Sequence, residues 1–202
     1  CAVQARRGPA RRPLPARAAE SRKLRAAGRR PRCGDCPAGR AVLELFAGCA
    51  RLSAAWRHRN LCIACPIDIS NGDHFDILDS RVFNEVCRWI RAGRIWALHL
   101  GTPCSRWSRA RTTGRPDSAV DRRGLRAALR TRALVRLCGE CGVFWTLENP
   151  ASSQLLRWRP LAALAEKQGA HLRKLHMCAY GAPWRKPTAV LGTLPALAEF
   201  GR

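Results

Sequence analysis

Apolar and polar positions alternate along residues 41–192 with two distinct periods. Four apolar runs have the length of buried strands and end at small, acidic or turn-forming residues; they are 41–46, 61–68, 95–100 and 143–150. Four further segments have helical character, most of them with apolar side chains at helical spacing; they are 50–59, 80–93, 119–138 and 152–168. Two final runs, 171–180 and 187–192, are suited to a terminal hairpin.

Strands that alternate with helices in this way predict the α/β class, with a mostly parallel sheet, helices on both faces and a C-terminal antiparallel hairpin. Ligands of such sheets bind beyond the carboxyl ends of the strands. Residues with unusual chemistry fall at those ends: Gly48, Asp68, Pro103, Cys104, Glu148 and Asn149. We therefore expect a ligand site there.

Composition divides the 202-residue chain at residue 40. Residues 1–40 are rich in Arg, Ala and Pro and lack apolar periodicity, so we expect a disordered tail. Residues 41–202 form the expected globular domain. An Arg-rich, acid-poor leader is also typical of an organelle transit peptide, and a nucleic-acid-binding arm is a third interpretation.

The charge balance is strongly basic in both parts. The net charge is +23, of which the tail carries +10 (12 basic minus 2 acidic residues) and the domain +13 (25 minus 12). Such a balance favours a polyanionic partner, most simply nucleic acid. A compositional bias toward Arg and Ala is the alternative explanation.

Cysteine usage favours an intracellular protein. Eleven cysteines, an odd number, occur in a sequence that shows no apolar h-region of a signal peptide, so we expect reduced thiols and not a disulfide framework. The CGDC pair at 33–36 has no second pair at finger spacing, so we expect no metal. No run approaches 18 apolar residues, so we expect no membrane span.

Three motifs at the strand ends carry candidate chemistry. In ELFAGCARLS (44–53) a strand enters a small-residue turn, and Asp68 follows Gly48 by 20 residues, which suits a carboxylate that binds ribose hydroxyls. An ordinary strand–helix turn is the alternative.

In GTPCSRWS (101–108) a basic loop follows Cys104 and would stabilise its thiolate, unless this cysteine is structural. In LENP (147–150) Glu148 could donate a proton, or serve as an acid near a helix start capped by Ser152.

In this order the motifs resemble those of the cytosine-C5 methyltransferases. The family pattern is a LFxGxGG cofactor turn, an acidic ribose ligand, a PCQxFS nucleophile loop, an ENV motif and a YGxPQxRxR segment, which YGAPWRKPT (180–188) resembles. The intervals agree as well: 36 residues from Asp68 to Cys104, 44 to Glu148 and 32 to Tyr180. The resemblance covers about residues 41–193.

The resemblance implies a Rossmann-like methyltransferase that transfers a methyl group from S-adenosylmethionine to C5 of cytosine in DNA, through a covalent cysteine adduct. The implied catalytic residues are Cys104, Glu148 and Asn149. The implied cofactor-binding residues are Phe46, Ala47, Gly48, Asp68, Asp76 and Pro103, with Asp73 and Asp79 as alternatives to Asp76 at the adenine. The expected nucleic-acid-binding residues are Arg106, Trp107, Arg109, Arg111 and Lys186.

The target base would have to leave its helix to reach such a site. RNA is a variant substrate that no residue here separates from DNA. A nuclear location is expected, or an organelle if residues 1–40 are a transit peptide.

Several positions depart from the family pattern. Cys49 and Ala50 replace the usual glycine pair, Trp184 replaces Gln, and Lys186 and Thr188 replace two arginines. No segment up to residue 202 resembles the family's target-recognition region, so we expect either a fragment or a minimal architecture. Two alternatives therefore remain: a non-catalytic nucleic-acid-binding domain of a larger, mobile-element-like polyprotein, and a plain Rossmann-like domain with an unrelated ligand.

Overall fold

The structure is a computed structural model, and it describes residues 40–108, 119–180, 183 and 185–199. Nearly all of the expected N-terminal tail, 1–40, therefore lies outside the described residues. No helix among the described residues is both long and apolar enough to cross a membrane.

A five-stranded sheet forms the centre of the molecule, in the order β1-β2-β3-β5-β4. Its strands are β1 (Ala41–Leu45), β2 (Ile95–Leu100), β3 (Phe144–Pro150), β4 (His171–His176) and β5 (Pro187–Gly192). Strands β1, β2 and β3 are parallel, whereas β5 runs antiparallel to both β3 and β4. The expected parallel sheet with a C-terminal antiparallel hairpin is confirmed.

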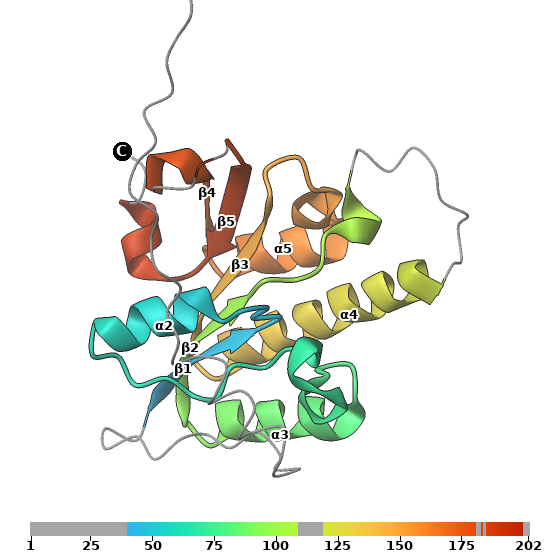
Figure 1. Cartoon of the computed structure of the whole chain (residues 1–202), viewed down its shortest axis with the longest axis vertical. Helices are drawn as coiled ribbons and strands as arrows, with labels where there is room; N and C mark the ends of the chain where they lie inside the picture. Colours follow the sequence, from blue (N-terminus) through green and yellow to red (C-terminus); the bar gives the residue numbers. More distant parts are fainter. Residues whose placement is uncertain (1–39, 109–118, 181–182, 184, 200–202) are drawn as a thin grey trace, which may run out of the picture.

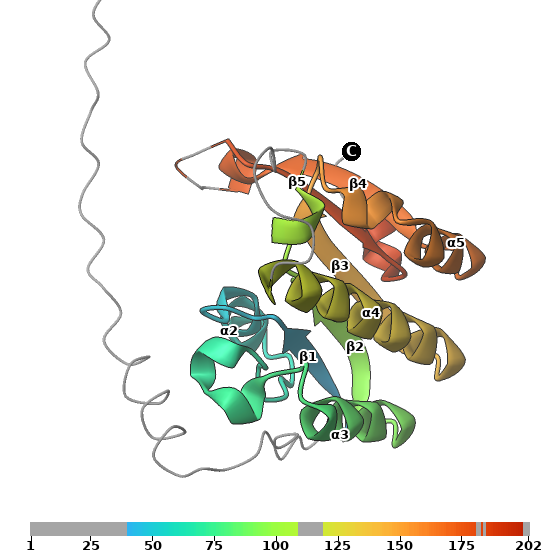
Figure 2. The ribbon, with the colours of Figure 1, turned by 90° about the vertical axis from the view of Figure 1, so that its right-hand side faces the viewer.

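Helices cover both faces of this sheet (Figures 1 and 2). Helices α3 (Ser80–Arg91), α4 (Ala119–Glu140) and α5 (Arg159–Lys167) lie side by side on one face. Helix α2 (Arg51–His58) packs beside β1 on the other. The long α4 lies between α3 and α5, so it holds the helical layer together.

Strand register places the apolar core on the α4 face. Leu43 pairs with Leu98, and Leu98 with Trp145, so these side chains share one face of the sheet. All three are at most 1% exposed. Burial of each leucine contributes roughly 1.5–3 kcal/mol relative to an exposed side chain. The opposite face is more polar, since Glu44 pairs with His99, and His99 with Thr146.

The apolar segment 61–68 does not form a strand of the sheet, so that prediction is wrong. It touches β1 through two isolated parallel bridges, Val42 with Ile63 and Leu45 with Ile67. Between these bridges β1 advances three residues and the segment four. The extra residue, together with Pro66, which has no N–H to donate, interrupts a regular ladder.

The predicted helix 152–168 is divided in two. A 3₁₀ turn, η4, spans Gln154–Arg157, and α5 begins only at Arg159. Trp158 between them is extended (φ −62°, ψ 111°). Pro160 in the first turn of α5 explains the break, because proline has no N–H to donate to the carbonyl four residues before it and its ring clashes with that carbonyl, so a helix can begin at Pro160 but cannot run through it.

Most described thiols are free, namely those of Cys49, Cys65, Cys87, Cys104, Cys138, Cys141 and Cys178. Cys62 is the exception, because it is disulfide-bonded. The expectation of reduced thiols is therefore wrong for Cys62.

Candidate active site

A pocket of about 260 Å³ lies at the carboxyl ends of β1 and β2, where the topology predicts a ligand site. Four of the six expected cofactor-binding residues line it: Phe46, Asp68, Asp76 and Pro103. Apolar side chains from the 69–78 segment complete one wall: Ile69, Phe75, Ile77 and Leu78. The pocket thus combines two carboxylates with apolar surface.

The turn after β1 is conformationally unusual. Phe46, Gly48 and Ala50 all have positive φ, at 55°, 51° and 51°. This bends the chain so that the Phe46 carbonyl comes close to Gly101, where a Cβ would lie 2.9 Å from the carbonyl oxygen. Gly101 is therefore needed because no side chain fits there. Ala47 and Gly48 shape the turn without being among the residues that line the pocket.

Asp68 connects this turn to the following segment. Its two carboxylate oxygens accept hydrogen bonds from Gly48 N and Ser70 N, both at 2.8 Å. The carboxylate is thereby held at the pocket wall, and each oxygen keeps a further lone pair for a hydroxyl donor. The hydrogen bond from Gly48 N therefore joins two residues of the expected ligand site.

Asp76 is the one of the three candidate aspartates that lines the pocket. Its Oδ1 accepts a hydrogen bond from Leu78 N at 2.9 Å, and its Oδ2 pairs with Arg123 Nη2 at 3.0 Å. Asp79 instead caps α3 through Arg81 N. Sequence reasoning missed Arg123, which comes from α4, 47 residues away, and no local signal pairs it with Asp76.

The candidate nucleophile lies on the loop after β2. Cys104 is free and half-buried, and it caps η3, a 3₁₀ turn over Ser105–Trp107. Burial raises the thiol pKa of Cys65, Cys87 and Cys138, so these thiols are poor nucleophiles.

Asn149 holds this loop against β3. Its Nδ2 donates hydrogen bonds to Thr102 O at 2.8 Å and to Glu148 O at 2.7 Å, while Asn149 is only 1% exposed. Thr102 in turn bonds through its hydroxyl to Thr131 of α4 at 2.7 Å. The Cys104 loop, β3 and α4 are therefore joined by one buried network.

Glu148 faces a cation at the same edge of the sheet. Its Oε1 lies 3.5 Å from Lys186 Nζ, and the Glu148 side chain is 30% exposed. The structure therefore brings Lys186 to a predicted catalytic residue, a pairing that the sequence analysis did not anticipate.

The expected nucleic-acid-binding residues are placed differently from one another. Arg106 pairs with the buried Asp121 of α4, and its guanidinium lies 5.6 Å from the Trp107 ring. Trp107 packs on Trp158, with ring centroids 5.5 Å apart, and its Nε1 is buried. Both residues therefore anchor the loop to the helical layer. Arg109 and Arg111 lie outside the described residues.

A buried carboxyl supports the turn after β1 from the other face of the sheet. Glu44 is 5% exposed and accepts hydrogen bonds from the backbone N–H, at 2.7 Å, and the hydroxyl of Ser53 in α2. Burial raises the pKa of Glu44, the Ser53 hydrogen bonds oppose this, and the charge of Asp68 adds to it. Glu44 therefore fixes the start of α2.

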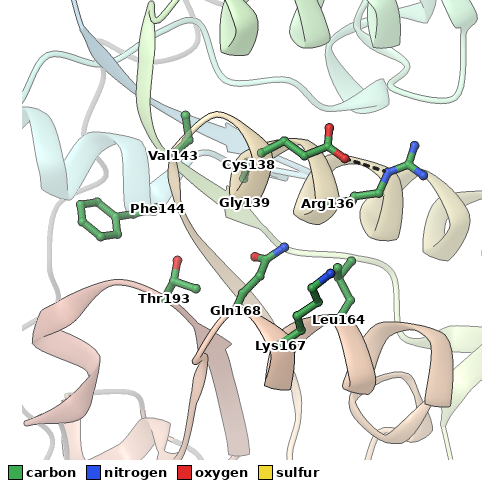
Figure 3. A pocket seen from close by; sticks show the side chains of 11 residues that line it. Arg136, Cys138, Gly139, Val143, Phe144, Leu164, Lys167, Gln168 and Thr193 are labelled. Carbon is green, nitrogen blue, oxygen red and sulfur yellow. Dashed lines mark ion pairs between the residues drawn. The ribbon is translucent and has the colours of Figure 1, made fainter.

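A larger hollow of about 600 Å³ lies near the opposite end of β3, between the C-terminal ends of α4 and α5 (Figure 3). Gln168 on its wall is already bonded to Trp145 Nε1 and to Val135 O. The charged lining consists of the Arg136–Glu140 pair and Lys167. Topology and chemistry both favour the smaller pocket as the functional site.

Among the described residues, no group of three or more His, Cys, Asp or Glu side chains could hold a metal ion.

Comparison with known proteins gives the class of fold. No family model and no curated protein sequence matches the chain. Among solved structures, the Dnmt2 methyltransferase of S. pombe is similar, with a TM-score of 0.53, 16% identity, and 76% of this chain and 50% of that chain covered. The Entamoeba histolytica methyltransferase EhMeth matches with a TM-score of 0.48, 14% identity, and coverage of 77% and 53%.

The chain thus has the Rossmann-like methyltransferase fold. It spans about half the length of the two solved structures, and its likeness to them is one of fold.

Proposed function

We propose that this chain is the catalytic core of an S-adenosylmethionine-dependent methyltransferase that modifies C5 of cytosine in DNA. The observation that carries the proposal is the hydrogen bond from Asn149 to Thr102 O. It holds the Cys104 loop beside the end of the Glu148 strand, at the rim of a pocket that contains Asp68 and Asp76.

The pocket residues fit the proposed cofactor. Asp68 would accept hydrogen bonds from the ribose hydroxyls, and Asp76 from the adenine amino group. Ile69, Phe75 and Ile77 offer apolar surface to the flat base. When bound there, S-adenosylmethionine would supply an electrophilic methyl group.

The chain's own residues would prepare the cytosine for this chemistry. The Cys104 thiolate forms a bond to C6 of the ring, which makes C5 electron-rich. Glu148 holds N3 through its carboxyl group and favours that attack. After C5 has been modified, a base removes the C5 proton and the Cys104 thiolate leaves from C6. Asn149 acts as a positioning residue through the loop.

A mechanism-based trap tests the proposal. With S-adenosylmethionine and a DNA oligonucleotide containing 5-fluorocytosine, the C5 fluorine cannot be removed as a proton, so the Cys104 adduct should accumulate. We expect a covalent band on denaturing gels that Cys104→Ala abolishes. The matched control is Cys141→Ser, which replaces an exposed free thiol elsewhere and should leave the band unchanged. An RNA oligonucleotide in parallel distinguishes the two polymers.

A second candidate function is a nucleic-acid-binding domain without catalysis. The Lys186–Glu148 ion pair favours it, because Lys186 competes with a base for the carboxylate. In that case the chain would bind the oligonucleotide and form no adduct, even with S-adenosylmethionine bound. Binding of neither compound would contradict both functions.

A further inference from the structure

Three arginines on one side of α4 reach toward the chain that leads into α3. Arg123 Nη2 pairs with Asp76 at 3.0 Å, Arg126 Nη2 donates to Leu78 O at 3.2 Å, and Arg130 Nη2 donates to Ser80 Oγ at 3.0 Å. Their spacing, i, i+3 and i+7, places them on one face of the helix. Arg123, Arg126 and Arg130 are called the α4 arginine row below.

Two members of the row carry an uncompensated charge. Arg126 bonds to a carbonyl and Arg130 to a hydroxyl, and neither forms an ion pair with any residue that the structure describes. Only Arg123 has a carboxylate partner. The row therefore presents more positive than negative charge along the contact between α3 and α4. Figure 2 shows these two helices side by side.

The nearby acids, one at the N-cap of α3 and one within the helix, do not neutralise the row, because each pairs with an arginine of α3. Asp79 pairs with Arg81 at 3.1 Å, and Glu85 pairs with Arg88.

The two uncompensated guanidinium groups are held in place before any ligand arrives. Arg130 lies over the Phe83 ring, with its Cζ 3.9 Å from the ring centroid. Arg126 and Arg130 each use one guanidinium nitrogen in the hydrogen bonds described above. Their other guanidinium nitrogens can donate to a second acceptor. Preorganised guanidinium groups match the oxygens of a phosphate, which they can bind in a bidentate manner.

The row begins at the candidate site. Arg123 and Val120 line the same pocket as Pro103 and Ser105, which flank Cys104. From there the row follows α4 for seven residues, or about 10 Å at ~1.5 Å per residue. This length corresponds to about three nucleotides of one B-DNA strand at ~3.4 Å each.

We propose that the α4 arginine row binds the phosphate backbone of the nucleic acid whose base enters the pocket. The nature of the polymer rests on the proposed function, whereas the binding itself does not require methyl transfer. The α4 arginine row is a second nucleic-acid-binding surface, besides the loop residues expected from the sequence. Because the row runs along α4, it sets the direction in which the bound strand leaves the pocket.

Salt-dependent binding tests the proposal. Fluorescence anisotropy with a labelled 20-base-pair DNA duplex, without S-adenosylmethionine, is measured from 50 to 200 mM NaCl. Each lost phosphate contact lowers the slope of log affinity against log salt by about 0.9. We expect R126Q/R130Q to lower it by about 2 and to weaken binding at least tenfold at 100 mM NaCl. R126Q alone should give about half of the slope change.

The matched control is R57Q/R59Q, which removes the same charge from exposed residues at the end of α2, on the other face of the sheet. It should weaken binding less than threefold. R126K/R130K keeps the charge and should keep most of the slope. Circular dichroism melting shows whether each variant is folded, and the single R126Q variant serves if the double variant is not.

If R126Q/R130Q and R57Q/R59Q weaken DNA binding equally, the overall positive charge binds DNA, and the proposal is overturned. The proposal is also overturned if neither double variant changes DNA binding. Tighter binding of phosphatidylserine vesicles than of DNA, lost in R126Q/R130Q, would overturn it in favour of a membrane surface. Calorimetric titration with S-adenosylmethionine is a separate measurement. Its failure would contradict the cofactor assignment and leave the row intact.

Discussion

At the scale of single residues, the turn after β1 contains a residue with a strained backbone conformation next to the candidate site. Ala50 has φ 51° and ψ 38°, a left-handed conformation that costs a side-chain-bearing residue energy. The cytosine-C5 methyltransferases, which the sequence resembles, have a glycine pair here. The conformation gives a physical reason for glycine at this position.

Ala50→Gly should therefore stabilise the protein by about 0.5–1 kcal/mol, because glycine adopts positive φ without a steric cost. Urea unfolding followed by tryptophan fluorescence measures the change. Ala54→Gly, within α2, is the control and should destabilise by about 1 kcal/mol. If both substitutions destabilise equally, Ala50 carries no strain.

His99 is a second residue whose environment departs from expectation. Its Nδ1 lies 2.8 Å from Thr146 Oγ1, and its ring meets Trp56 edge-on with centroids 6.0 Å apart. Burial lowers the pKa of His99 from 6.5 to about 4. The folded protein thus favours the neutral ring, although nothing in the sequence around His99 indicates this.

This pKa shift predicts a defined loss of stability in acid. The contribution of His99 is complete above pH 6.5 and falls as the pH drops from 6.5 toward 4, because protonation then favours the unfolded chain. His99→Asn should remove on the order of 2 kcal/mol of that pH dependence, allowing for a ring that is only partly buried. The measurement is the free energy of unfolding at pH 7 and pH 4. The same measurement on His58→Asn, at an exposed residue, is the control for replacing a histidine by asparagine.

At the scale of elements, the site depends on how β2, β3 and α4 are tied together beyond the strand ends. One amide, Asn149 Nδ2, links the β3 end to Thr102, and Thr102 links to Thr131 of α4. The Asn149 Oδ1 atom is buried without a hydrogen-bond partner among the described residues. The hydrogen bonds of the Asn149 side chain are those that its Nδ2 donates to the backbone of the Cys104 loop and of β3.

Asn149→Ala should lower stability by about 1–3 kcal/mol, since it leaves the buried Thr102 carbonyl without its donor. It should also reduce adduct formation about 100-fold, because the Cys104 loop shifts, while affinity for S-adenosylmethionine stays within threefold. Rates of 5-fluorocytosine adduct formation and calorimetric titration separate the two effects. Asn84→Ala, exposed on α3, should change stability by less than about 0.5 kcal/mol. An equal loss of cofactor affinity would contradict a positioning role.

At the scale of the whole molecule, the large excess of positive charge affects stability. A net charge of +23 on 202 residues repels itself, and this repulsion opposes the compact state. Native ion pairs such as Arg123–Asp76 and Lys186–Glu148 act in the opposite direction. Because repulsive pairs outnumber attractive ones, screening should favour folding.

Raising NaCl from 50 to 500 mM should therefore increase stability by on the order of 1 kcal/mol, which corresponds to a rise in Tm of about 2–4 °C for a domain of this size. Thermal melting by circular dichroism measures it. KCl in place of NaCl should give the same shift, since screening does not depend on the cation. A lower Tm in salt would mean that the native ion pairs outweigh the repulsion.

Much of the architecture follows from local pattern. The strands at 41–46, 95–100 and 143–150, the helices at 50–59, 80–93 and 119–138, and the terminal hairpin are confirmed with small shifts in their ends. Side-chain periodicity decides these elements because it depends on neighbours within a few residues. Once the strands are parallel, their carboxyl ends meet at one edge, so the turn after β1 and the Cys104 loop after β2 could be placed near each other in advance.

Only the tertiary structure decided which side chains contact one another across elements. Arg123 pairs with Asp76, 47 positions away in the sequence, and Trp107 packs on Trp158, although a nucleic-acid-binding role was expected for it. Arg126 and Arg130 became a candidate phosphate-binding row only because α4 packs against α3. Such contacts depend on which faces of helices and strands pack together. The local sequence pattern shows that one face of a helix or strand is apolar or basic, but it does not determine which other element packs against that face.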